Sequence, residues 1–273
     1  MIVQRVTIPP PGPTPMSDLS CRGYDLDPAA FPSLAAALGE SLETVMSVHR
    51  LRRALARAWV IGDPTRPDAA IVQGTLLPEE PHAFGEDPAA ILALLREVPG
   101  WQCVNAPEAL APALADLIAR ETGASCILGP EIYLVQDAPP PGRHPVARRL
   151  LPADLPLLDA ATGPLNMHGW RFGSAARLLE YGIAAGVVED GRLAAAAFTS
   201  ALGERFAEVG IVTRPDARGR GHATGCAAIV CDMLHRRGVT PVWSVAADNH
   251  ASLRVAARLG FRETSRRIYL CRG

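Results

Sequence analysis

The sequence predicts an α/β protein built from two consecutive halves. Segments with strand and helix periodicity alternate along the chain, and the order strand, helix, hairpin, strand, helix, strand, helix, strand is reached loosely twice. Proline-rich composition predicts an extended arm at residues 1–16 and a stiff linker at 139–145. We therefore expect an N-terminal domain at 17–138 and a second domain at 146–273, and we favour an internal duplication over two unrelated domains.

In the first half, helices are expected where apolar residues recur every three to four positions, and strands where short apolar runs end in turn-forming residues. Asp87, followed by Pro88, is typical of a helix start. The expected helices are 42–59, 88–98 and 107–120, and the expected strands are 59–61, 69–72, 102–104 and 126–136, the last being one strand or a strand pair.

The second half has clearer boundaries. Asp190-Gly191 is typical of a two-residue hairpin turn, and Gly238 and Gly260 are typical helix ends. The expected helices are 174–181, 222–237 and 249–259, and the expected strands are 146–150, 184–189, 192–199, 206–213, 242–247 and 261–271. A helix joins strands 206–213 and 242–247 through short loops, so these strands should be parallel within a mixed central sheet.

Composition excludes several classes of function. The net charge is −1, which argues against nucleic-acid binding, and the chain contains no lysine for a Schiff base or a P-loop. The six cysteines form no zinc motif, and a chain of this length needs no disulfide for stability. No signal peptide or membrane-length apolar run is visible. We therefore expect a reduced cytoplasmic protein without a metal site or membrane contact.

The stretch 214–224, Arg-Pro-Asp-Ala-Arg-Gly-Arg-Gly-His-Ala-Thr, carries the functional signal. It follows an expected strand and opens an expected helix, where glycines and free N–H groups can hold a phosphate or pyrophosphate. The spacing fits neither a dinucleotide fold nor a P-loop. A glycine-rich turn that binds nothing is the remaining alternative.

The spacing R-x-x-G-x-A at Arg218, Gly221 and Ala223 resembles the GNAT superfamily of acyl-CoA-dependent N-acyltransferases. Strand 206–213 before the loop, and Asn249-x-x-Ser252 with Leu259-Gly260-Phe261 after it, extend the resemblance over residues 146–271. It implies a mixed central sheet flanked by helices. The first half has no such loop, so a degenerate GNAT-like copy there should not bind CoA.

The resemblance implies acetyl-CoA as co-substrate and a small-molecule or peptide amine as acceptor, with direct attack in a ternary complex. Glu208 is the candidate general base, with a structural role as the alternative. The implied contacts to the acyl carbonyl, the pantetheine arm and the pyrophosphate are Ile211, Val212, Thr213, Arg218, Gly219, Arg220, Gly221, His222, Ala223 and Thr224. We expect Arg218 and Arg220 to add positive charge to this site, and the side chain of His222 to face solvent.

The leaving thiolate needs a donor, and here the chain departs from the family. Many members have a tyrosine seven residues after the asparagine, where this chain has Ala256. Ser252 is the leading replacement, with an ordinary helix residue as the alternative. Asn249 is a second candidate, or a helix cap. Both would also contact CoA, and Tyr269 is a weaker candidate.

Other functions stay open at this level. The chain could be a CoA-binding protein without catalysis, or a glycine-type N-acyltransferase that uses another acyl-CoA. Residues 168–172 are expected either to border the acceptor or to form a packing cluster. The sequence specifies neither the acceptor, the acyl length nor the oligomeric state.

Overall fold

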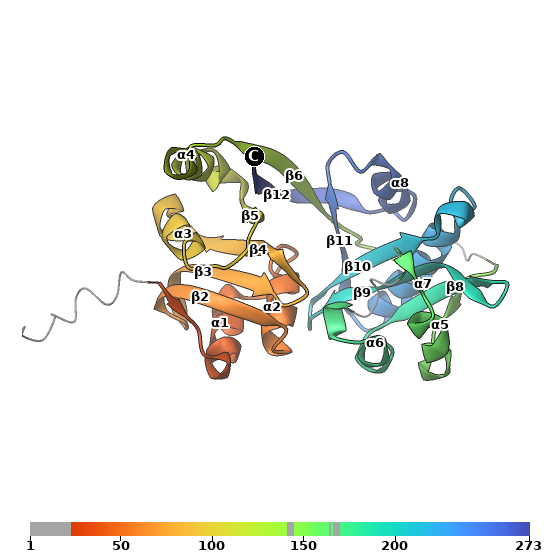
Figure 1. Ribbon diagram of the computed structural model, residues 1–273. Helices are drawn as coiled ribbons and strands as arrows, with labels where there is room; N and C mark the ends of the chain where they lie inside the picture. Colours follow the sequence, from red (N-terminus) through yellow and green to blue (C-terminus); the bar gives the residue numbers. More distant parts are fainter. Residues whose placement is uncertain (1–22, 141–144, 164, 166–169) are drawn as a thin grey trace, which may run out of the picture.

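A computed structural model describes residues 23–140, 145–163, 165 and 170–273 (Figure 1). The expected arm at 1–16, most of the expected linker, and residues 168–169 lie outside the described residues. The division into two domains at the linker therefore stays a prediction.

A single mixed sheet of twelve strands runs through the described chain, in the order β1-β2-β3-β4-β5-β12-β6-β11-β10-β9-β8-β7. Among its described strand pairs, β4 with β5 and β10 with β11 are parallel, and the others are antiparallel. The strands are β1 (Tyr24–Asp25), β2 (Ala56–Asp63), β3 (Arg66–Gly74), β4 (Leu77–Gly85), β5 (Cys103–Pro107), β6 (Cys126–Val135), β7 (Arg148–Arg149), β8 (Ala184–Glu189), β9 (Arg192–Leu202), β10 (Phe206–Thr213), β11 (Thr240–Ala246) and β12 (Arg262–Arg272).

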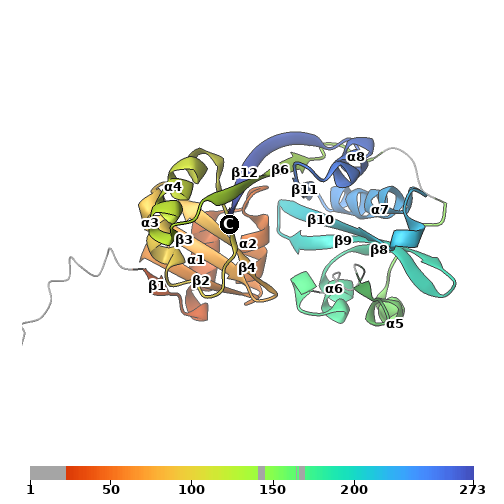
Figure 2. The same ribbon diagram turned by 45° about the horizontal axis from the view of Figure 1, so that its top comes forward.

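Helices cover both faces of each half of the sheet, as Figures 1 and 2 show. In the N-terminal half, one apolar core includes α3, α4 and strand residues such as Val104 and Leu270, and another includes α1, α2 and Val72. The helices are α1 (Phe31–Leu38), α2 (Val45–Arg52), α3 (Pro88–Leu95), α4 (Ala111–Thr122), α5 (Leu155–Asp159), α6 (Ala175–Tyr181), α7 (His222–Arg236) and α8 (His250–Arg258).

One order of elements occurs twice, as the sequence predicted. The series β2-β3-β4-α3-β5-α4-β6 recurs as β8-β9-β10-α7-β11-α8-β12. In each series, an antiparallel meander of three strands is followed by a helix and a strand parallel to the third. The repeat agrees with a duplicated unit.

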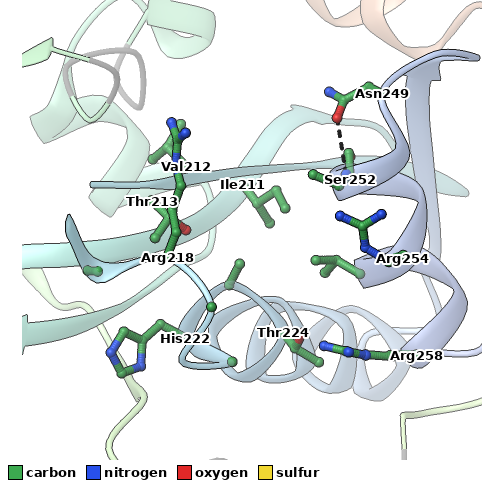
Figure 3. A pocket seen from close by; sticks show the side chains of 16 residues that line it. Ile211, Val212, Thr213, Arg218, His222, Thr224, Asn249, Ser252, Arg254 and Arg258 are labelled. Atoms are coloured by element: carbon green, nitrogen blue, oxygen red, sulfur yellow. Dashed lines mark hydrogen bonds between the residues drawn. The ribbon is translucent and has the colours of Figure 1, made fainter. Parts of the chain in front are cut away.

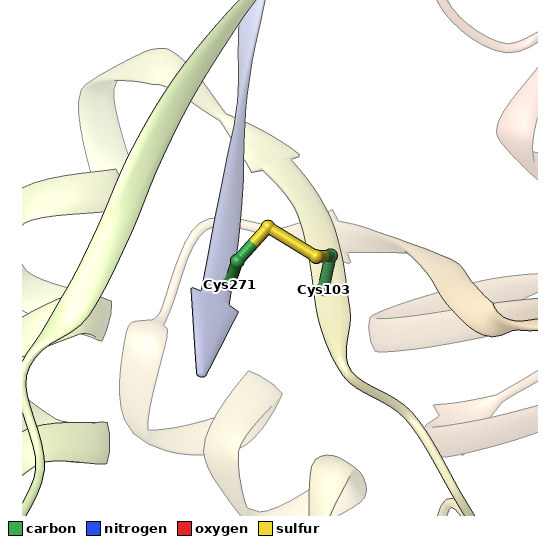
Figure 4. Close-up of a disulfide and its surroundings, with 2 residues drawn as sticks. All are labelled: Cys103 and Cys271. Atoms are coloured by element: carbon green, nitrogen blue, oxygen red, sulfur yellow. A yellow bond between two sulfur atoms is a disulfide. The ribbon is translucent and has the colours of Figure 1, made fainter. Parts of the chain in front are cut away.

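The two halves exchange their last strands, which the sequence did not reveal. Strand β6 pairs with β11, and β12 pairs with β5, while β6 and β12 also pair with each other. A disulfide between Cys103 and Cys271 joins β5 to β12 at directly opposed positions (Figure 4). The expectation that the chain has no disulfide was wrong, because strand exchange brings together two cysteines that lie 168 residues apart.

Local expectations were most accurate in the second half. Strand β10 has the expected bounds, and its parallel pairing with β11 is confirmed. In the first half, the expected helix 42–59 was too long, because the chain turns at Ala54 with a φ of 53° before β2 begins. Strand β4 was missed, since two prolines and two glutamates interrupt its apolar pattern.

Glu40, which lies in the segment between α1 and α2, connects the two halves through hydrogen bonds. Its carboxylate accepts hydrogen bonds from the backbone N–H groups of Glu204, Arg205 and Phe206, at 2.7–3.0 Å. Burial alone would raise the pKa of Glu40, but these donors and Arg52 lower it overall. Helix α2, which follows, contacts β9 and β10 as well as β2 and β3, so it lies at the junction of the two halves (Figure 2).

Candidate active site

The sheet opens beside the glycine-rich loop. Strands β10 and β11 pair only from Phe206 with Thr240 to Glu208 with Val242, and the opposite edge of β11 pairs with β6. The second half of β10, residues 209–213, therefore has a free edge on this side. A free edge of this kind offers backbone N–H and C=O groups to a ligand.

The loop after β10 leads into a helix with an open N-terminus. Gly219 and Gly221 have φ values of 78° and 80°, in the left-handed region that favours glycine. Gly221 is the N-cap of α7, and as a glycine it has no side chain to accept a hydrogen bond from the first turn. The first helical N–H groups have no partner within the helix, so they can bind an anion.

A cavity of about 630 Å³ lies between β10, the loop and the two helices α7 and α8 (Figure 3). Three cationic side chains from two elements face it: Arg218 from the loop, and Arg254 and Arg258 from α8. Its lining consists of Ile211, Val212, Thr213, Ala217, Arg218, Gly219, Gly221, His222, Ala223, Thr224, Asn249, Ala251, Ser252, Arg254, Val255 and Arg258. The shape and charge suit a ligand with several phosphates.

Most of the expected contact residues line this cavity, but Arg220 does not. Its guanidinium lies 3.2 Å from Glu189 and donates to the Asp216 carbonyl, so this side chain is held outside the cavity lining. His222 is 7% exposed rather than solvent-facing. The Nε2 atom of His222 lies 3.1 Å from the carboxylate of Glu189, so the ring lies against the residue that also contacts Arg220.

The sequence analysis missed Arg254 and Arg258. Both lie on α8, one helical turn apart and on the face that also carries Ala251 and Val255. Spacing from Ser252, the residue that the sequence analysis singled out, does not lead to them, because they lie two and six positions after it. Together with Arg218, they place positive charge around the cavity.

Asn249 and Ser252 occupy the start of α8. The Asn249 side-chain oxygen accepts a hydrogen bond from the Ser252 N–H at 3.1 Å, so Asn249 caps the helix (Figure 3). The Ser252 hydroxyl lies 2.9 Å from Trp243 Nε1, which donates to it. Because the indole N–H only donates, the hydroxyl proton of Ser252 stays available to another acceptor.

Glu208 lies where the parallel pairing of β10 ends. Its neighbours Ala207 and Val209 are buried in the core beside α7, so Glu208 faces the opposite side of the sheet, as alternation predicted. The pairing of β9 shifts here, leaving Ser200 as an extra residue opposite Glu208 and Val209. Glu208 Oε1 accepts a hydrogen bond from the Ser244 hydroxyl at 2.8 Å.

A second carboxyl group, Glu131, lies close to Glu208 and was missed by the sequence analysis. Its Oε2 accepts hydrogen bonds from Asn105 at 2.7 Å and Tyr133 at 3.1 Å, and it also interacts with Ser244. Burial, followed by the negative charge of Glu208, raises the pKa of Glu131 to about 7. Only the exchange of strand β6 brings this residue to the site, so no local pattern could reveal it.

Tyr269 is not placed to serve a thiolate in the large cavity. It lies on β12 opposite Asn105 and does not line that cavity. Burial, followed by the charges of Glu131 and Glu80, raises its pKa.

Neither a metal centre nor a membrane span is found in the described parts of the chain. Within them, no group of three or more His, Cys, Asp or Glu side chains could hold a metal ion. Likewise, none of the described helices is both long enough and apolar enough to cross a bilayer.

Solved structures share this fold. The chain resembles a GCN5-related N-acetyltransferase-like protein from Streptococcus suis, with 17% identity, a TM-score of 0.67, and coverage of 90% of this chain and 99% of the other. A GNAT-family structure from Novosphingobium aromaticivorans has 28% identity and a TM-score of 0.52, over 74% and 88% of the two chains. A tandem GNAT protein from the clavulanic acid biosynthesis pathway has 16% identity and a TM-score of 0.55, over 91% and 97%.

A mixed sheet with helices on both faces is the fold that this chain shares with these GNAT structures. Residues 168–269 match the family model of the GNAT acetyltransferases, so this part of the chain is a GNAT acetyltransferase domain. The repeated topology agrees with a second GNAT-like copy in the N-terminal half, as in a tandem GNAT protein. No curated protein matches the sequence significantly.

Proposed function

We propose that this protein transfers the acetyl group of acetyl-CoA to a primary amine by direct attack in a ternary complex. The open N-terminus of α7, beside the free edge of β10, is the observation that carries this proposal. It offers phosphate-binding N–H groups and strand-type hydrogen bonds within one cavity, as a CoA ester requires.

Each part of acetyl-CoA has a matching group. The N–H groups at Gly221–Thr224 would hold the pyrophosphate, and Arg218, Arg254 and Arg258 would hold further phosphate charge. The free backbone of Ile211–Thr213 would pair with the amides of the pantetheine arm. An N–H group from the same segment would stabilise the oxyanion that forms on the acetyl carbonyl.

Glu208 is the proposed base for the acceptor. A lysine-like amine with a pKa near 10.4 is neutral in only about one molecule in a thousand at pH 7, so removal of its proton accelerates attack. The neighbouring Glu131 has a pKa raised to about 7 by burial and by the charge of Glu208, so it keeps its proton below that pH. Two nearby acids with different environments are a common way to define a base.

Ser252 is the proposed donor to the departing thiolate. As the C–N bond forms and the C–S bond breaks, the sulfur gains negative charge. The Ser252 hydroxyl accepts from Trp243, and its own proton can therefore point into the cavity. This arrangement would replace the tyrosine that is absent at Ala256.

Thiol release from acetyl-CoA, measured with a panel of primary amines, tests the proposal. We expect amine-dependent release and a product whose mass rises by one acetyl group. Titration calorimetry on the same protein should detect acetyl-CoA binding. Acetyl-CoA binding without turnover of any amine would contradict the enzymatic role and support the non-catalytic alternative.

A further inference from the structure

A continuous row of polar side chains crosses the sheet beneath α2. Directly opposed residues in neighbouring strands lie on the same face, and so do alternate residues along one strand. Strand register and alternation together therefore define this row. It runs across six neighbouring strands, through His82, Asn105, Tyr269, Arg267, Glu131, Tyr133, Ser244 and Glu208. Glu208, the proposed base, is one end of the row, and His82 in the N-terminal half is the other.

Arg50 on α2 covers this row with a buried positive charge. Arg50 is only 5% exposed, and within the described chain its guanidinium forms no ion pair or hydrogen bond. Burial, followed by the charge of Arg171, lowers its pKa to about 10, so it stays protonated at neutral pH. The charges of Glu208 and Glu80 favour the protonated form, although neither carboxylate lies within ion-pair distance.

A second guanidinium, from Arg171, borders the same place. Arg50 and Arg171 line a cavity of about 20 Å³ beside the β3–β4 turn, large enough for one water-sized group. Gly74 in this turn makes room for the charge, since a Cβ there would lie 3.0 Å from Cζ of Arg50. Two cations therefore meet at a small cavity without a carboxylate in contact among the described residues.

Three polar atoms in this region have no partner in the described part of the chain. They are Nη1 of Arg50, Nδ1 of His82 and the hydroxyl of Ser47, and all three are buried. Burial, followed by the charges of Arg50, Arg267 and Arg171, lowers the pKa of His82, so its ring is neutral. A buried charge and buried polar atoms without partners destabilise a protein unless a ligand satisfies them.

We propose that Arg50 and Arg171 bind a carboxylate of the acceptor, whose amino group faces Glu208 along the same row. The acceptor is then an amino acid or another amine that carries a carboxylate. The small cavity suits one carboxylate oxygen better than a phosphate group. This inference rests on the proposed acetyltransfer, because it assigns the second substrate of that reaction.

The test compares matched amines with and without a carboxylate. Thiol release at saturating acetyl-CoA is measured with glycine, β-alanine and the common amino acids, with their decarboxylated counterparts, and with 2-aminoethyl phosphate. We expect turnover mainly with carboxylated amines. Arg50→Met should raise their KM about 10- to 100-fold, as expected for loss of a hydrogen bond to a charged group, and change kcat little. Arg50→Lys should restore part of the affinity.

Arg52→Met is the matched control, because Arg52 is on the same helix but its side chain is 40% exposed and pairs with Glu40. It should leave KM unchanged. A second readout separates binding from a structural role: without acceptor, Arg50→Met should melt at the same temperature as the parent or higher, since it removes a buried unpaired charge. A marked fall in melting temperature would make Arg50 structural and overturn the inference.

The remaining outcomes are separable. Equal turnover of neutral and carboxylated amines, unaffected by Arg50→Met, would overturn the carboxylate subsite and leave acetyltransfer intact. Preference for 2-aminoethyl phosphate would also overturn it, in favour of a phosphate. No turnover of any amine, with acetyl-CoA still bound, would overturn the proposed function and this inference with it.

Discussion

In each half, a helix follows the third strand of the meander: α3 follows β4, and α7 follows β10. The two helices differ in how their N-termini are capped. In the N-terminal half, β4 leads directly into α3, where Asp87 accepts a hydrogen bond from the Ala89 N–H at 2.8 Å. Pro88, in the first turn, has no N–H to offer. In the C-terminal half, a longer loop leads to Gly221, which as a glycine has no side chain to cap the start of α7.

This difference supports our proposal that only the C-terminal copy binds CoA. Asp87 satisfies one of the orphan donors at the start of α3, whereas Gly221 has no side chain to do so in α7, whose donors we propose bind an external anion. The strands before the helices also differ in one side chain. Glu208 and His82 occupy equivalent positions, each in the parallel pairing with the next strand, but the first is a carboxylic acid and the second an imidazole. We infer that the C-terminal copy keeps the chemistry and that the N-terminal copy supplies walls for the acceptor.

Replacing the proposed base should have the largest effect. Glu208→Gln keeps the shape of the side chain but removes the base, so kcat should fall about 10²- to 10³-fold near neutral pH. The loss should shrink at high pH, where the amine is neutral without help. Glu121→Gln, which removes a surface carboxylate paired with Arg96 in the N-terminal half, is the control. Parallel pH–rate profiles for Glu208→Gln and the parent from pH 6 to 10 would exclude Glu208 as the base.

Blocking the open helix N-terminus should weaken acetyl-CoA binding about 10- to 100-fold. In Gly221→Val, a β-branched side chain must adopt a φ near 80° and would crowd the pyrophosphate. Gly123→Val is matched for strain, because Gly123 has a φ of 75° at the end of α4 and its Cβ would meet nothing within 4 Å. Calorimetry should show a raised Kd only for Gly221→Val. An unchanged Kd in that variant would remove the loop from the binding site.

How much the sequence predicted depends on the range of the interaction concerned. Gly221, Ser252 and the bounds of β10 were predicted, because loop spacing, helix faces and strand alternation are local properties. Arg254 and Arg258 lie on another face of α8 than Ser252, so its helical spacing did not lead to them. The orientation of Arg220 was wrong, since Glu189 on the neighbouring hairpin attracts its guanidinium.

Features that depend on strand exchange could not be predicted. Glu131 reaches the site only because β6 enters the C-terminal half of the sheet, and Cys103 meets Cys271 only because β12 enters the other half. Arg50 was not identified either, because its side chain is buried only by the contacts of α2 with strands of both halves. Local periodicity holds no information about such contacts between distant segments.

The buried Glu131 carboxyl predicts a specific pH dependence of stability. Its folded-state pKa of about 7 lies above the unfolded value of about 4.3, so folding takes up a proton between these values. Its contribution to the free energy of unfolding is therefore lost as pH rises through this window. Glu131→Gln should be about 1–3 kcal/mol more stable than the parent at pH 8 and nearly equal to it at pH 4.5. Urea unfolding at both values checks this, and an equal difference at both would contradict the shifted pKa.

The smallest effect should come from removing the side chain that caps α3 in the N-terminal half. Asp87→Ala removes the side chain that caps α3, and loss of such a cap costs about 1 kcal/mol of stability. Urea unfolding should detect that loss, while the Kd for acetyl-CoA should not change. Acetyl-CoA should not gain a second site either, because Pro88 still lacks the N–H that a phosphate would need and the glycine-rich loop is absent there. A change in Kd, or a stoichiometry above one, would show that the N-terminal copy still takes part in CoA binding and that the two junctions differ less than their caps indicate.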